Sequence, residues 1–368
     1  ARNVKMKQKK VWKPPSSEKL ALSTDELVRK TLCDIREGRH PFCHNEDRLF
    51  ELLEKQVELI DSIENPEVKL ELLARFLNTD GILAEFDYED FAELYTDMAS
   101  YFVEEAETFE NKEYLAALVH DLALNHTGED GRSAVFLMVE NFLPKERLTL
   151  LFEEILETVE MHNLENAESV LEALCDMADC VQNTEIYERS RLLQDPDRSN
   201  STLLDIANFC LTAKDIASTK RLLGAVTLPQ AEDLEDFLDL RIAVLEAEGS
   251  KSEMIALAEE LYERFPKEMH LGKLCSIVSI ERRSALLDNY IKYHSGTNIS
   301  VGFLQILVAF NEIERLEVYL NQKGDEQLTT LPAETLSVLA EELEDKGADK
   351  LASRIREWIV EEPEDLRE

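Results

Sequence analysis

Four cysteine and histidine side chains lie close together near the start of the sequence, and they are of the types that hold metal ions. They are Cys33, His40, Cys43 and His44. A structural zinc ion takes four such ligands at the corners of a tetrahedron. The spacing matches no known zinc finger, and Cys33 falls on a predicted helix while the histidines follow in a loop. We therefore expect no bound metal, and these four residues are the metal-ligating candidates that the sequence offers.

A second group of residues has the types needed for proton transfer. His120 and Asp121 are adjacent and His126 follows, as for a general base with an orienting carboxylate. No nucleophile and no glycine turn for an oxyanion accompany them, so we interpret them as the solvated end of a helix. The HExxH, P-loop, GxSxG and GxGxxG motifs are also missing from the sequence. The sequence therefore predicts no catalytic residue and no cofactor. An enzyme whose site is assembled across helices remains an alternative.

Adjacent acidic residues recur along the chain. Paired carboxylates hydrolyse glycosides only in a cleft where one of them has a raised pKa. On amphipathic helices such pairs usually lie on the solvated face. We expect a solvated position for Glu104-Glu105, Glu153-Glu154, Glu259-Glu260 and Glu341-Glu342.

The distribution of the cysteines indicates the redox state of the compartment in which the protein is found. They are scattered through a long chain, at Cys33, Cys43, Cys175, Cys180, Cys210 and Cys275. This distribution favours free thiols in a reducing environment over a disulfide framework. No apolar run is long enough for a transmembrane helix, and no apolar stretch follows the N-terminal charges as in a secretory signal. We expect an intracellular, cytoplasmic protein that makes no contact with a membrane.

The charge is large and unevenly distributed. The chain holds 40 Lys and Arg against 77 Asp and Glu, a net charge of −37. Residues 1–20 carry seven basic side chains and one acidic side chain, so the remaining 348 residues carry a net charge of −43. A body this acidic repels phosphate backbones, which argues against nucleic-acid binding by the body, and it attracts basic partners. Solubility is the alternative role of the acidic charge.

Residues 1–20 form a basic tail or linker with no helical period. Lys9, Lys10, Trp12 and Lys13 combine positive charge with an aromatic ring that can insert into a partner or stack on a base. These four residues are the predicted partner-binding group of the tail. If the chain contacts nucleic acid, we expect the contact to be made by this segment alone.

Beyond the tail the apolar residues follow a helical period. Leu49, Leu52, Leu53, Val57 and Ile60 recur on one helical face, and no segment alternates convincingly with a period of two. Only 11 Gly and 10 Pro interrupt the chain. The pattern predicts an all-α protein of about seventeen to nineteen helices with short connections. We expect the aromatic stripe through Phe91, Tyr95 and Phe102 to lie in the core.

Two late segments share a pattern of helix, Gly, helix, Pro. In one the glycine is Gly249 and the proline Pro266, and in the other they are Gly347 and Pro363. Residues Leu240–Pro266 resemble a tetratricopeptide hairpin. Residues 160–360 also resemble an uncharacterised bacterial helical-repeat family, some of whose relatives accompany SWIM-type zinc-finger proteins. The resemblance implies an α-solenoid and supplies no catalytic residue. No strict period is kept, so an irregular HEAT-like array stays open.

We predict three regions: the tail 1–20, an N-terminal helical region 21–143, and tetratricopeptide-like repeats over 144–368. The function favoured by these features is a non-catalytic interaction scaffold that binds a basic protein or peptide on an acidic helical-repeat surface. The alternatives are an adaptor that reaches nucleic acid through the basic tail, and the unrecognised enzyme described above.

Overall fold

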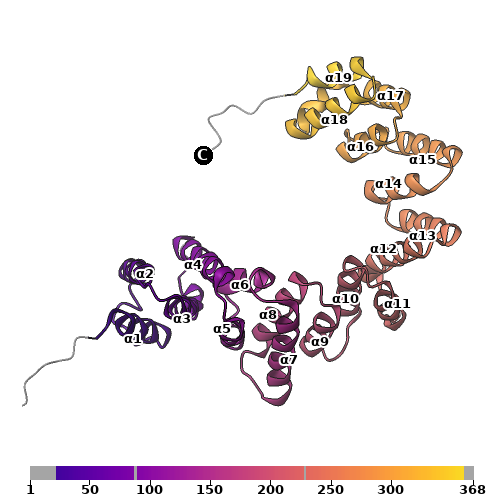
Figure 1. Cartoon of the computed structure of the whole chain (residues 1–368). Coiled ribbons are helices and arrows are strands. Elements are labelled where there is room, and N and C mark those ends of the chain that lie inside the picture. The colour runs from indigo at the N-terminus through magenta and orange to yellow at the C-terminus, as the bar shows by residue number, and fades with distance from the viewer. Residues whose placement is uncertain (1–21, 87–88, 228, 360–368) are drawn as a thin grey trace, which may run out of the picture. The chain divides into compact units, whose positions relative to one another are not determined.

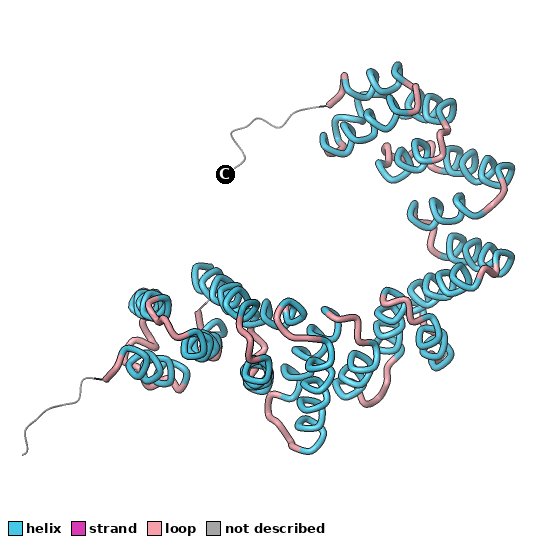
Figure 2. The backbone as a smooth tube through the Cα atoms, viewed as in Figure 1, coloured by secondary structure: helices cyan, strands magenta, loops and turns pink. Residues whose placement is uncertain are grey.

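The computed structural model describes residues 22–86, 89–227 and 229–359. These residues form nineteen α-helices and four short 3-10 helices, and no strand occurs among them (Figures 1 and 2). The predicted all-α fold is therefore confirmed. No helix in this part of the chain is both long and apolar enough to cross a bilayer. Two compact units divide the chain between Arg198 and Ser199.

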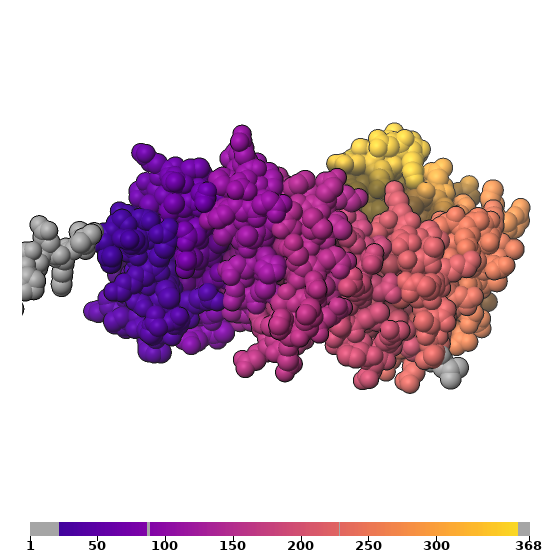
Figure 3. All heavy atoms as spheres, turned by 60° about the horizontal axis from the view of Figure 1, so that its bottom comes forward, coloured from indigo at the N-terminus to yellow at the C-terminus, as the bar shows by residue number. Residues whose placement is uncertain are grey.

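The first unit contains nine α-helices and three 3-10 helices among its described residues (Figure 1). Figure 3 shows its side chains, coloured indigo to magenta, packed into a continuous body. The predicted boundary between residues 143 and 144 falls inside this unit, just before α7, and it stays a prediction. The elements are α1 Thr24–Arg36, α2 Glu46–Asp61, α3 Pro66–Leu77, η1 Asp80–Ala84, α4 Glu89–Thr108, α5 Lys112–Leu124, η2 Asp130–Arg132, α6 Ser133–Leu137, η3 Val139–Asn141, α7 Lys145–Met161, α8 Ala167–Cys180 and α9 Thr184–Gln194.

The second unit contains ten α-helices and one 3-10 helix among its described residues. They are α10 Asn200–Thr212, α11 Ile216–Ala225, α12 Ala231–Glu248, α13 Lys251–Arg264, α14 Glu268–Ile277, α15 Ile280–Tyr293, α16 Val301–Ala309, α17 Ile313–Lys323, η4 Asp325–Thr330, α18 Ala333–Asp345 and α19 Asp349–Arg356.

Many helices begin at a residue that satisfies the free backbone N–H groups of the first turn. Asn65 precedes Pro66, and its side-chain oxygen accepts from the N–H groups of Glu67 and Val68. Proline suits the first helical position because its φ is already helical and its missing N–H has no partner there. The same side-chain cap starts the later helices α9, α11 and α16, where Asn183, Asp215 and Ser300 supply it.

Buried apolar side chains form one core in the first unit, and another that runs from α12 to α19 in the second unit. In the first unit, Phe91, Tyr95 and Phe102 of α4 have no exposed surface, as expected for core residues. In the second, Phe303 and Tyr319 pack edge to face with their ring centroids 4.9 Å apart. Burial of these large apolar side chains is the main source of the stability of each unit.

Five hairpins share one tight turn, in which a single residue adopts a left-handed conformation between the two helices. The N–H of the next residue then donates to the carbonyl four residues before the left-handed one, as from Ser250 to Leu245 at 2.9 Å. This bond satisfies a carbonyl that the helix end would leave without a partner. The left-handed residues are Gln182, Lys214, Gly249, Asn311 and Gly347.

Helices of the second unit pack in a regular order. The even-numbered helices α10, α12, α14, α16 and α18 form one row, which lies on the same side of the unit in Figure 1. Three of the neighbouring pairs, α10 with α12, α14 with α16, and α16 with α18, make direct helix contacts. Ion pairs join α12 to α14 and to the residue just before it, with Lys273 of α14 2.6 Å from Glu246 and the preceding Lys267 2.7 Å from Glu235. Each odd-numbered helix packs on the even-numbered helix before it.

Candidate functional site

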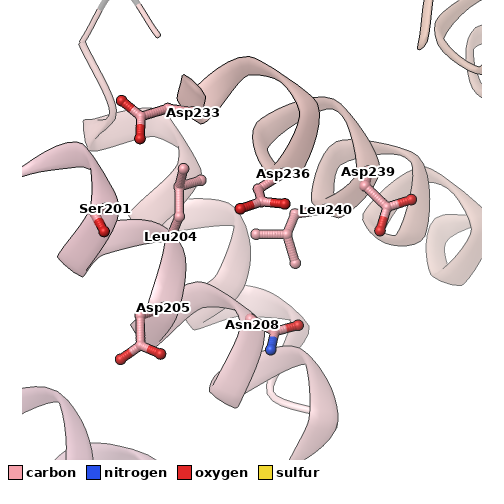
Figure 4. Close-up of a pocket in the computed structure, with 8 residues that line it drawn as sticks. All are labelled: Ser201, Leu204, Asp205, Asn208, Asp233, Asp236, Asp239 and Leu240. Atoms are coloured by element: carbon pink, nitrogen blue, oxygen red, sulfur yellow. The ribbon is translucent and has the colours of Figure 1, made fainter. Parts of the chain in front are cut away.

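An acidic cleft opens between α10 and α12 of the second unit, with a volume of about 380 Å³. Four aspartates line it: Asp205 comes from α10, while Asp233, Asp236 and Asp239 come from α12. Figure 4 shows Asp236 pointing toward α10. None of the eight lining residues is basic. The three aspartates of α12 therefore favour a positively charged group in the cleft.

The spacing on α12 explains why its three aspartates share one side. Residues three apart lie on neighbouring positions of a helical face, and like charges at this spacing repel one another. Asp233 also lies in the first turn of α12, where the positive end of the helix dipole stabilises a carboxylate. A lysine or arginine side chain entering the cleft relieves the repulsion. The signal for this site in the sequence is the spacing Asp233-x-x-Asp236-x-x-Asp239, which was not among the predicted site residues.

An apolar cleft of about 690 Å³ lies further along the same row of helices, between α14 and α16. Gly272 and Gly302 leave room in it, since a Cβ at Gly272 would lie 3.5 Å from Ile306. Ile306 and Phe310 form part of its wall, and Met269 at its edge is 67% exposed. This surface suits an apolar side chain of a partner. The row thus offers one cleft for positive charge and one for apolar groups.

The predicted cysteine and histidine cluster makes other contacts. Cys43 is buried and its thiol points to the carbonyl of Ile35 at 3.9 Å. The His40 ring accepts a hydrogen bond from the N–H of Phe42 at 3.1 Å, and the Cys33 thiol lies 3.7 Å from a Glu37 oxygen. Across residues 22–86, 89–227 and 229–359, no group of three or more His, Cys, Asp or Glu side chains is placed to hold a metal ion.

His44 and Cys43 line a polar cleft of about 310 Å³ in the first unit. Across it, Arg36 donates to the side-chain oxygen of Asn125 at 2.8 Å. The polar groups of this cleft are largely engaged with one another, as in the bond from Asn78 to Asp121 at 3.0 Å.

Asp121 and His126, two of the candidates for proton transfer, lie in different environments. Asp121 accepts hydrogen bonds from Asn78 and Asn125. His126 is 3% exposed, packs edge to face on Phe136, and has no hydrogen-bond partner for Nδ1. Its burial, together with the positive charge of Arg132, lowers the pKa of His126 to about 4. It is a neutral residue of the interior at pH 7, and the interpretation as a solvated helix end does not hold for it.

Beside His126 lies a buried ion pair that the sequence analysis did not foresee. Arg132 and Asp80 both have no exposed side-chain surface, and Arg132 Nε donates to Asp80 at 2.8 Å. The guanidinium also donates to Asn78 at 2.6 Å and to the carbonyl of Leu122 at 2.9 Å. Gly131 permits this approach, because a Cβ there would lie 2.9 Å from the Cβ of Asp80. The pair joins η1 to η2 and has no opening to solvent, so its role is structural.

The four pairs of adjacent glutamates lie on the surface as expected, and none of their eight members is buried. Asp176 on α8 is half-buried, and its burial, and then the nearby Glu172 and Asp179, raise its pKa to about 6. Cys175 on the same helix is buried and Cys180 is half-buried. Lys9, Lys10, Trp12 and Lys13 lie outside the described residues.

Comparison with known proteins adds little to this geometry. No family model matches the chain, and no curated protein matches it. A solved structure described as a circular tandem repeat protein with novel repeat topology and enhanced subunit contact surfaces shares 14% sequence identity. The match covers 90% of this chain and 74% of that one, with a TM-score of 0.21. The fold assignment therefore rests on the helices of this chain, and the tetratricopeptide and SWIM-associated families remain resemblances.

Proposed function

We propose that this chain is a non-catalytic interaction scaffold that binds a basic protein segment along the even-numbered helices of its second unit. The observation that supports the proposal is the cleft to which α12 contributes Asp233, Asp236 and Asp239, with no basic residue among its lining. Stacked helical hairpins expose extended surfaces, which suit peptides and folded domains better than small metabolites.

The apolar cleft between α14 and α16 adds a second requirement for the partner. Charged contacts near a surface raise association rates and specificity, whereas affinity comes mainly from buried apolar side chains. The exposed Met269 and the wall formed by Ile306 and Phe310 give an apolar side chain a place to be buried. We propose that the partner segment carries lysine or arginine residues together with at least one large apolar residue.

The proposed interaction is tested with a peptide probe that contains three lysines and a flanking leucine and phenylalanine. The double variant Asp236→Lys/Asp239→Lys reverses the charge of the acidic cleft, and we expect it to weaken binding at least tenfold in calorimetry. The matched control is Glu314→Lys/Glu317→Lys on α17, which changes the net charge equally at two exposed positions away from the cleft.

The control distinguishes the cleft from the overall charge. Binding that falls equally in both double variants would show that total charge, and not the cleft, attracts the peptide. Binding that is unchanged in the cleft variant would refute the site. We also expect the association rate to fall from low to high salt more than the dissociation rate changes, because salt screens exposed charges beyond about 8 Å.

The alternative function, an adaptor that binds nucleic acid through residues 1–20, has no described residue in its favour. It remains a prediction that deletion of Lys9, Lys10, Trp12 and Lys13 would test in a nucleic-acid binding assay at several salt concentrations.

A further inference from the structure

A groove lined mainly by aromatic and apolar side chains lies between α13 and α15 of the second unit, separate from both clefts described above. Its volume is about 630 Å³. Tyr262, Pro266, Leu286, Tyr290 and Tyr293 form most of its lining. Tyr293 is 85% exposed, so its ring is accessible to a partner at the edge of the groove.

The floor of the groove is held rigidly. The ring of Tyr290 stacks on Phe303 with centroids 4.0 Å apart, and its hydroxyl donates to Glu268 at 2.8 Å. His294 packs on the other side of this network, with its ring centroid 4.2 Å from that of Tyr290 and 5.3 Å from that of Tyr293. A ligand would therefore meet a preformed aromatic surface and would not have to order it.

Polar groups at the rim suit a peptide backbone and a positive charge. Asn289 is exposed, and its carboxamide makes no hydrogen bond with the described residues. A carboxamide can both donate to and accept from a peptide backbone. Glu263 lies at the edge formed by α13, and Lys292 at the edge formed by α15. Only the α13 edge is complementary to a basic side chain.

Aromatic grooves of this kind bind proline-containing segments. Proline is apolar, and its restricted backbone loses little entropy on binding. Its carbonyl accepts hydrogen bonds well, and a rim carboxamide such as that of Asn289 can supply the donor. The lining of the groove thus specifies a peptide with proline next to a basic residue.

The chain itself contains such a sequence in its first twenty residues. The segment Lys9–Pro15 reads Lys-Lys-Val-Trp-Lys-Pro-Pro, which joins two prolines to basic residues and a tryptophan. Residues 1–20 carry a net charge of +6 and the rest of the chain −43, so long-range attraction favours their encounter. We propose that the groove between α13 and α15 binds the Lys9–Pro15 segment of a second copy of the chain.

The contact would be heterologous, because the segment and the groove are different surfaces of the same chain. Such contacts produce closed rings, reciprocal dimers or open chains of subunits, and all of them depend on protein concentration. The full-length protein is therefore expected to associate with itself, and residues 1–20 supplied as a synthetic peptide are expected to dissociate the assembly by competition.

Sedimentation velocity of the full chain over a concentration series tests the proposal. Tyr293→Ala removes the exposed ring and Pro14→Ala/Pro15→Ala removes the prolines, and each is expected to weaken self-association at least tenfold. The matched control is Ile280→Ala, which removes a 70% exposed apolar side chain at the other end of α15 and is expected to leave it unchanged. Unchanged helical circular dichroism establishes that each variant is folded.

Three results would overturn the assignment. One is a chain that stays monomeric at every concentration, even if the peptide of residues 1–20 binds to it. Another is self-association that neither Tyr293→Ala nor Pro14→Ala/Pro15→Ala weakens. The third is equal weakening by Ile280→Ala, which would indicate a general effect on α15. None of these variants alters the acidic cleft, so the result is independent of the proposed scaffold function.

Discussion

Arg132 is the largest of the fully buried side chains in the described part of the chain. A guanidinium in this position is tolerated because Asp80, Asn78 and the carbonyl of Leu122 accept its hydrogen bonds. Burying a charge costs free energy even when all its hydrogen bonds are made. Removing one partner of a buried ion pair costs more, because the other charge then stays buried without a partner.

Removing Arg132 is therefore expected to destabilise the first unit strongly. Arg132→Ala leaves the Asp80 carboxylate buried without its partner, and we expect a loss of about 3–5 kcal/mol in the free energy of unfolding. Urea denaturation followed by circular dichroism measures this change. The control is Arg189→Ala, which breaks the exposed pair with Glu153 and is expected to cost less than about 1 kcal/mol. Similar losses in the two variants would contradict the structural role of the buried pair.

His126 makes the stability of the first unit depend on pH. Its pKa is about 4 in the folded chain and 6.5 in the unfolded reference, so the unfolded chain binds more protons between these values. The contribution of His126 to stability is full above pH 6.5 and is lost as the pH falls toward 4, by about 3 kcal/mol in total.

The variant His126→Leu removes this dependence while keeping an apolar contact with Phe136. We expect the difference in unfolding free energy between wild type and variant to change between pH 6.5 and pH 4, in favour of the variant at low pH. Comparing the two proteins cancels the titration of the many surface acids. A difference that is constant over this range would show that His126 titrates normally.

At the scale of the elements, the left-handed turn residues make a clear prediction. Lys214 occupies the same turn position as Gly249, and its side chain adds a steric cost that glycine avoids. We expect Lys214→Gly to raise the unfolding free energy by up to about 1 kcal/mol, because relief of the left-handed strain exceeds the entropy that glycine adds to the unfolded chain.

The reverse exchange, Gly249→Ala, is expected to lower the unfolding free energy by about 1 kcal/mol. A Cβ at Gly249 would meet nothing within 4 Å, so this loss would come from the backbone alone. Thermal and urea denaturation measure both changes. A stabilising Gly249→Ala, or a destabilising Lys214→Gly, would show that the turn geometry does not control these hairpins.

The same turns show how much of the fold the sequence could predict. The apolar period identified the helices, and two hairpins were recognised because their turns contain Gly249 and Gly347. Three equivalent turns were missed because Gln182, Lys214 and Asn311 occupy the left-handed position. Glycine is a visible signal for this conformation, whereas other residues adopt it only when the packing of the two helices requires it.

The candidate site was less predictable than the fold. Helical spacing places Asp233, Asp236 and Asp239 on one side of a helix, but only the packing of α12 against α10 adds Asp205 and forms a cleft. Likewise, nothing in the sequence pairs Asp80 with Arg132, which are far apart along the chain. Contacts between distant residues depend on tertiary packing that periodicity does not encode.

At the scale of the whole molecule, we expect the basic tail to contribute to binding and little to the stability of the fold. Residues 1–20 contain little apolar surface to bury. We expect their deletion to change the unfolding free energy by less than about 1 kcal/mol at low protein concentration, as measured by urea denaturation. A larger loss would show that Trp12 packs on the helices of the same chain.

The orderly row of helices in the second unit has a further consequence for how such a chain can change over time. Its extensive helix contacts join elements one or two places apart in order, so no hairpin depends on a remote segment for its packing. A duplication or deletion of one complete hairpin would change the packing at the junction it creates and leave the contacts of more distant hairpins unchanged. Chains of this kind can thus gain or lose length by recombination, with the repacking confined to the helices next to the new junction.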